Sequence, residues 1–171
     1  DTDSVDVVFD DVPAMLVGTP HAYVRRPGFW QGGAGIAACW WGGAAGIATA
    51  ARMHAAARGQ PDPHLQAHLG SLDVALQGAA AVLREAAAWI DRHPAADAQV
   101  WALRTRLAVE HAAEQVLWHT GRALGAGPLC KNAALARAMA DLPVFLRQSH
   151  AERDLATLGH LLLPSPDPWT L

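Results

Sequence analysis

Residues 27–51 read PGFWQGGAGIAACWWGGAAGIATAA, a stretch without charge between Arg26 and Arg52. Its length of about 25 residues would be enough to span a membrane. Seven of these residues are glycine, however, and Ile36 and Ile47 are the only aliphatic anchors, so hydrocarbon would gain little from it. We therefore expect a buried helix of a soluble domain, with no membrane partner.

Glycine destabilises this predicted helix, because each interior glycine costs about 1 kcal/mol relative to alanine. Close approach to another backbone can offset that cost. The smallest side chains recur along the helix, which predicts that a neighbouring helix or a flat ligand packs against its main chain. The residues in this row are Gly35, Cys39, Gly42, Gly43 and Gly46.

The composition supports an all-α fold. Alanine is the most frequent residue, and β-branched and aromatic residues are too few for a fold dominated by sheet. At 171 residues the chain fits one domain, which would bury roughly 70% of its unfolded surface. The formal net charge is −3 and the arginines are scattered, so we expect no nucleic-acid partner.

Two features indicate a cytoplasmic protein. Cys39 and Cys130 lie on separate segments without metal-ligand spacing, which is typical of buried thiols in a reducing compartment. The first residues include Asp1, Asp3 and Asp6 and lack the basic and apolar pattern of a secretory leader. We therefore expect ordinary buried thiols and a cytoplasmic location.

Helix signals after the first stretch predict three more helices. Pro63 opens a second helix that runs to His93, and a third covers about residues 97–124. Asn132 can cap a fourth helix, which is expected to kink or split where it meets Pro143. Four helices joined by short connections predict an up-down four-helix bundle.

The beginning of the chain has a different pattern. Val5, Val7 and Phe9 alternate with polar residues, which predicts one short strand. Because one strand cannot form a sheet, we interpret this segment as the remainder of a missing β-domain. The domain boundaries that follow are 1–24 for the end of that domain and a connector, 25–163 for the bundle and 164–171 for a non-helical tail.

The first candidate site lies near the end of the chain, where Arg147, His150 and Asp154 share one face if the segment is helical. Asp154 would then hold His150 in one tautomer and favour its protonated form, which suits acid–base chemistry near neutral pH. The alternative is a surface ion pair that contributes a few tenths of a kcal/mol. Both interpretations stay open, because the pair adjoins an apolar stripe of Ala151, Leu155, Leu158 and Leu162.

The second candidate site is the glycine-containing turn of residues 121–127. Its small residues and amides, with Arg122 beside them, suit a phosphate or the edge of a nucleotide. Gly125 and Gly127 are the positions of interest, although glycine after a helix is also an ordinary C-cap.

Metal binding has little support in the sequence. No glutamate is followed by a histidine three residues later, which excludes the di-iron pattern of helical bundles. His64 and His68 are one turn apart but have no evident third ligand. Glu110, His111 and Glu114 are typical of an exposed helix face. We expect no metal.

Four segments resemble the C-terminal part of the acyl-CoA dehydrogenase superfamily. Residues 5–20 resemble the last strand and exit of its middle β-domain, and residues 26–38 the start of its first bundle helix. Gly121–Gly127 resembles its Gly-Gly-x-Gly turn, which touches the FAD of a partner subunit, and Ala136-Arg137 with Asp141 resembles its approach to the active site. The resemblance implies an FAD-dependent oxidoreductase that oxidises the CH–CH bond of an acyl thioester, as a homo-oligomer, dimer or tetramer.

The chain also departs from the family pattern. Ser149 and Arg26 stand at the two places where members carry the catalytic glutamate, so Glu152 or Asp154 would have to substitute from a shifted register. A histidine in this region is similar to the flavin-dependent monooxygenases of the same fold. Residues 58–60 are a loose counterpart of the arginine signature that grips the cofactor pyrophosphate.

The resemblance implies that the chain is the C-terminal bundle of such a flavoprotein and is inactive as an isolated fragment. We expect His150 to be the polar group near the flavin, oriented by Arg147 and Asp154. A non-catalytic module that self-associates through its glycine-rich helix is the rival from another class. The adenine end of FAD is expected to contact Arg122, Gly125 and Gly127.

Overall fold

The computed structural model describes residues 5–59, 62–164 and 169, and within them the chain is all-helical. The predicted all-α class is therefore confirmed. The helices are α1 (Ala22–Arg25), α2 (Pro27–Ala57), α3 (Pro63–Arg92), α4 (Gln99–Leu124), α5 (Ala126–Lys131), α6 (Ala133–Leu146) and α7 (Glu152–Leu162).

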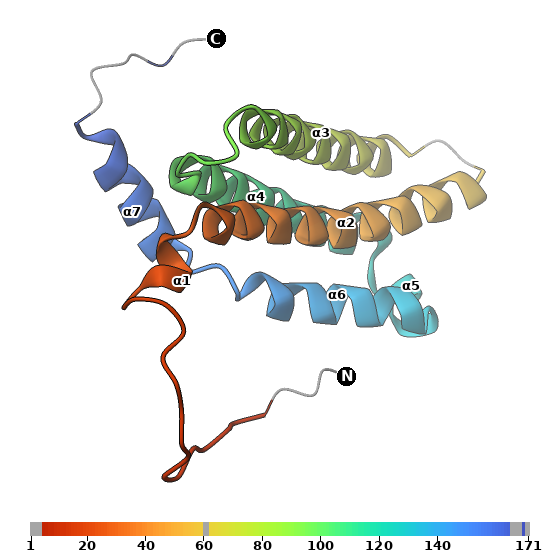
Figure 1. Ribbon diagram of the computed structural model, residues 1–171. Helices are drawn as coiled ribbons and strands as arrows, with labels where there is room; N and C mark the ends of the chain where they lie inside the picture. The colour runs from red at the N-terminus through yellow and green to blue at the C-terminus, as the bar shows by residue number, and fades with distance from the viewer. Residues whose placement is uncertain (1–4, 60–61, 165–168, 170–171) are drawn as a thin grey trace.

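The long helices α2, α3 and α4 form the body of the molecule (Figure 1). Helix α4 packs extensively on both α2 and α3, while α6 covers α2 on the side opposite α3. Helix α7 contacts α4 at the end where α1 and α2 begin. The regular form of the expected four-helix bundle is not confirmed, because α4 and α6 touch only slightly and α3 and α6 do not touch.

The helix ends follow the sequence signals. Asp62 caps α3 by accepting hydrogen bonds from the amides of His64 and Leu65, at 3.0 and 3.2 Å. Asn132 caps α6 as expected, with its side chain 3.1 Å from the amide of Leu135. Gly125 ends α4 in a conformation with φ +65° and ψ −168°, which is almost restricted to glycine. Local backbone chemistry therefore defines the starts of α3 and α6 and the end of α4.

Helix α2 is central to the core, but it packs through a different face from the one predicted. Its buried side chains are Ala34, Ala37, Trp40, Ala44, Ile47, Ala48 and Ala51. The row of Gly35, Cys39, Gly42, Gly43 and Gly46 is exposed, and of these only Gly43 would meet a neighbour through an added Cβ, Leu142 at 3.3 Å. Burying the tryptophan and isoleucine face removes more apolar surface from water than burying the glycine face would.

Among the described helices, α2 alone is long and apolar enough to cross a membrane by length and composition. Its most apolar window is 39% buried, and the core helix of a soluble protein meets the same criterion.

Three expectations need correction. The strand at Val5, Val7 and Phe9 is absent: residues 5–10 have no regular secondary structure, because an unpaired strand has no partner for its backbone hydrogen bonds. Helix α6 continues through Pro143 to Leu146, and the break follows at residues 147–151. Cys39 and Cys130 are free but exposed rather than buried. Most of the expected tail, 164–171, lies outside the described residues.

Candidate functional site

A cavity of about 350 Å³ lies where the first turns of α2, the N-terminal part of α4 and the start of α7 meet. His150 and Asp154 both line it. The other lining residues are Tyr23, Arg26, Gly28, Phe29, Trp30, Gly32, Gly33, Ile36 and Arg106. His150 therefore lies beside α2, the helix that carries Phe29 and Trp30.

The irregular segment 147–151 positions His150. Its backbone N–H donates to Oδ2 of Asp154 at 3.3 Å, and its Nδ1 lies 3.5 Å from Oδ1 of the same carboxylate. The His150 side chain is 57% exposed, whereas that of Asp154 is only 13% exposed. A largely buried carboxylate therefore backs an imidazole that can still meet a ligand, and the catalytic role of the pair stays a prediction.

Arg147 does not join His150 and Asp154. Because residues 147–151 are not helical, the helical face that the three residues were expected to share does not form. Nη2 of Arg147 instead lies 3.2 Å from Oε1 of Glu110 and 3.4 Å from Oε1 of Glu114. Its contacts give it no part in orienting His150.

Arg106 occupies the place that was expected for Arg147. Its guanidinium donates to the carbonyl oxygen of Gln148 at 2.8 Å and to that of Gly33 at 3.3 Å. Its Cζ also lies 4.7 Å from the centroid of the buried Trp40 ring. Burial lowers the pKa of Arg106, and the negative charges of Asp154 and Glu110 oppose that shift. The guanidinium stays protonated and ties α2, α4 and the 147–151 segment together.

Aromatic side chains form another wall of the cavity. The rings of Tyr23 and Phe29 meet edge to face at 5.9 Å, and Phe29 and Trp30 do so at 5.3 Å. Cζ of Arg26 lies 4.3 Å from the centroid of Tyr23. An added Cβ at Gly32 would meet nothing within 4 Å, so main chain is accessible beside these rings. The wall suits a flat ligand that combines apolar faces with polar edges.

Glu110 is buried beneath the same segment, although the sequence indicated an exposed face. Oγ of Ser149 donates to Oε2 of Glu110 at 2.5 Å, and both residues are buried. Ser149 also accepts from the amide of Ala151 at 3.3 Å. The sequence signal for this support was the spacing of Arg106 and Glu110, four residues apart on α4, which places both on one helix face.

Arg122, Gly125 and Gly127 lie at the other end of α4. Sixteen residues separate Arg106 from Arg122, which is about 24 Å along a helix. Cζ of Arg122 stacks 4.7 Å from the centroid of Trp118, and the amide of Gly125 donates to the carbonyl of Gly121 at 3.0 Å. Gly127 borders a different cavity, with His54 and Lys131. The expected free amide at Gly125 is therefore already used by the helix.

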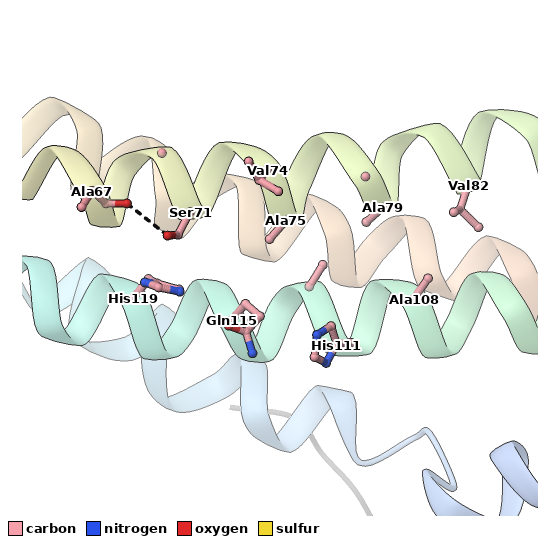
Figure 2. A pocket seen from close by; sticks show the side chains of 13 residues that line it. Ala67, Ser71, Val74, Ala75, Ala79, Val82, Ala108, His111, Gln115 and His119 are labelled. Atoms are coloured by element: carbon pink, nitrogen blue, oxygen red, sulfur yellow. Dashed lines mark hydrogen bonds between the residues drawn. The ribbon is translucent and has the colours of Figure 1, made fainter.

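A second cavity, a groove of about 780 Å³, lies between α3 and α4 (Figure 2). Small side chains of α3 form one wall, and His111, Gln115 and His119 of α4 stand opposite. Near one end of the groove, Nδ1 of His119 lies 2.9 Å from Nδ1 of His68. Burial lowers the pKa of His119, with further contributions from the nearby charges of His68 and Arg122.

Comparisons with protein-family models, curated proteins and solved structures find no match to this chain.

Proposed function

We propose that this chain is the C-terminal helical bundle of an FAD-dependent oxidoreductase similar to the acyl-CoA dehydrogenases. In this proposal α2, α3, α4 and α6 correspond to the family's up-down four-helix bundle. The observation that carries the proposal is the His150–Asp154 pair beside an aromatic cavity, at 3.5 Å between Nδ1 and Oδ1. The parent enzyme would act on an acyl thioester, and the isolated bundle would be inactive.

The residues around this cavity fit the edge of a flavin ring in their chemistry. Phe29 and Trp30 offer apolar surface, the backbone at Gly32 is accessible, and Arg106 supplies a positive charge. Bound FAD would supply the hydride acceptor. The imidazole of His150 can hold a proton at Nδ1 or Nε2, and the carboxylate of Asp154 orients the ring.

Among the described residues that line this cavity, no free carboxylate stands in for the family's catalytic glutamate. Ser149 is committed to Glu110, Arg26 stacks on Tyr23, and Asp154 is held by His150. This favours chemistry in which an imidazole replaces the acid. A flavin-dependent monooxygenase of the same fold is therefore the closest alternative activity.

The first described residues support an adjoining domain. Val8, Met15 and Val17 are 88%, 92% and 93% exposed, although apolar side chains gathered on one short segment normally pack against protein. In the proposed parent enzyme, another domain would pack against these apolar side chains.

Flavin binding by the full-length gene product tests the proposal. The purified protein, with FAD added, should show the visible absorbance of bound flavin, and His150→Ala should weaken binding or change the spectrum. His160→Ala is the matched control, because it removes an exposed histidine from α7, the helix that follows the segment carrying His150. A protein that stays colourless with added FAD, or equal behaviour of the two variants, would contradict the proposal.

Self-association is a second candidate function, favoured by the exposed glycine row on α2. In this row Gly35, Gly42 and Gly46 have no neighbour within 4 Å of an added Cβ. A second copy packed against this face would offset the cost of the glycines. Light scattering should then show a homo-oligomer, a dimer or tetramer, that Gly42→Leu disrupts. A monomeric wild-type protein would contradict it.

The proposal also keeps the cytoplasm as the location. The two cysteines are free, which supports a reducing compartment.

A further inference from the structure

Two histidines from different helices meet at the end of the α3–α4 groove, remote from the His150 cavity. His68 comes from the second turn of α3 and His119 from the second-last turn of α4. Their Nδ1 atoms are 2.9 Å apart, and the ring planes are inclined by 58°. Both residues are half-buried, and within the described residues neither ring has another hydrogen-bond partner.

The geometry points to a metal site: we propose that His68 and His119 bind one divalent transition-metal ion and thereby clamp α3 to α4. Metal–imidazole bonds are about 2.0–2.1 Å long, so two ligand nitrogens are about 2.9 Å apart when the angle at the metal is near 90°. The observed separation of 2.9 Å matches this value, and small rotations of the two rings accommodate the wider angle of a tetrahedral ion.

Water completes the coordination. In the described part of the chain no group of three histidine, cysteine or acidic residues is placed to hold an ion. The ion would therefore bind through two protein ligands on rigid helices, and its affinity would depend strongly on each one. The solvent side of the half-buried pair leaves room for those waters.

The surrounding charges determine which ion fits. Neutral imidazole is the form that binds metal, and the guanidinium of Arg122 lies near His119. Arg122 also repels a dication, which disfavours ions held by charge alone. Ions that bind imidazole strongly overcome this repulsion, with Cu²⁺ ahead of Ni²⁺ and Zn²⁺, whereas Mg²⁺ prefers oxygen ligands.

Trp118 provides a local signal. Its ring centroid lies 6.1 Å from that of His68 and 4.6 Å from that of His119. A Cu²⁺ ion held between the two imidazoles would quench its fluorescence. The protein has other tryptophans, so Trp118→Phe identifies the share of the quenching that comes from this site.

The test is a Cu²⁺ titration of the whole 171-residue chain, followed by fluorescence, with pulsed electron paramagnetic resonance to count coordinated imidazoles. We expect one equivalent of Cu²⁺ with two imidazoles. His68→Ala and His119→Ala should each weaken binding roughly tenfold or more, since the loss of a ligand should exceed the loss of a supporting contact, and should leave one imidazole. His111→Ala is the matched control, because His111 lies about 12 Å from His119 along α4 and should leave the affinity unchanged.

Three results would contradict the proposed metal site between His68 and His119. A single imidazole in the wild-type protein, or unchanged affinity in His68→Ala, would show that the pair does not bind the ion. An equal loss in His64→Ala and His68→Ala, with none in His119→Ala, would place the site on α3 alone. Circular dichroism checks the fold of each variant. If either alanine variant unfolds, His68→Gln and His119→Gln keep polar side chains of similar size and should show the same loss.

Discussion

Replacing Glu110 with alanine tests whether a buried carboxylate holds the 147–151 segment in place. The side chain of Glu110 is 8% exposed, and it accepts hydrogen bonds from Ser149 at 2.5 Å and from Arg147 at 3.2 Å. Its removal leaves the buried hydroxyl of Ser149 without this acceptor. The segment that carries His150 should therefore loosen.

The expected magnitude follows from these contacts. A hydrogen bond to a charged group contributes about 1.5–3 kcal/mol, and an ion pair with a solvent-exposed arginine adds at most about 1 kcal/mol. We expect Glu110→Ala to lower the free energy of unfolding by about 2–4 kcal/mol. Glu114→Ala is the matched control: it removes the other partner of Arg147, but Glu114 is 52% exposed, so its loss should be below about 1 kcal/mol.

Urea unfolding of both variants measures this difference. A double-mutant cycle with Ser149→Ala isolates the Glu110–Ser149 contact, and the double variant should lose less stability than the sum of the two single variants. Equal losses in Glu110→Ala and Glu114→Ala would refute the reasoning. Additive losses in the cycle would show that the short hydrogen bond is not what holds the segment.

Three further predictions concern the fold. Leu146 is 1% exposed, so Leu146→Ala should leave a cavity and lower the free energy of unfolding by about 2–5 kcal/mol. Urea unfolding measures the loss, with Val144→Ala at a 73% exposed position as the control. Equal losses in the two variants would contradict the packing of α6. Gly125→Ala should cost about 1–3 kcal/mol, measured in the same way, since φ is +65°; no loss would show that this backbone conformation is not required. The hydrogen bond from the amide of Leu65 lowers the pKa of Asp62 in the folded protein from its ordinary value of 3.8. The ionised Asp62 cap therefore stabilises the folded protein above pH 3.8, and this stabilisation is lost as the pH falls through the lowered pKa of the folded state. Asp62→Asn keeps a capping group but should reduce this acid dependence of unfolding; an unchanged pH profile would contradict it.

Local signals explain why the helices could be predicted from the sequence. Pro63 and Asn132 favour helix starts through backbone chemistry that acts within one turn. In the structure α3 begins at Pro63, and Asn132 is the N-cap of α6. Pro143 was misleading: it removes one backbone hydrogen bond, to the carbonyl of Met139, yet α6 continues past it to Leu146. The break came instead at residues 147–151, where Arg106 and Glu110 bind the segment from another helix.

The candidate site was only partly predictable for the same reason. The pairing of His150 with Asp154 is local, and the structure brings the two together. The role of Arg106 in holding the 147–151 segment depends on its hydrogen bonds to Gly33 and Gln148, which are 73 and 42 residues away in sequence. No local pattern separates such an arginine from a solvated one. The same holds for His68 and His119, which are 51 residues apart.

The two sets of residues expected to contact FAD lie at opposite ends of α4. His150 is tied to the Arg106 end by the contact of Arg106 with Gln148, and Arg122 lies about 24 Å further along the helix. If both act on one cofactor, they most simply come from different subunits. The proposed function predicts the same arrangement, because the glycine turn of the acyl-CoA dehydrogenases touches the FAD of a partner subunit. The prediction can be tested with the full-length protein.

Co-expression of His150→Ala and Arg122→Ala subunits separates the two arrangements. In a dimer with shared sites, a mixed pair carries one intact site and one doubly altered site. Random assembly should then restore about a quarter of the wild-type flavin-dependent activity. If each site is built within one subunit, every site in the mixture carries one of the two changes and no activity returns. Each variant expressed alone is the control, and the sharing argument requires that both are inactive.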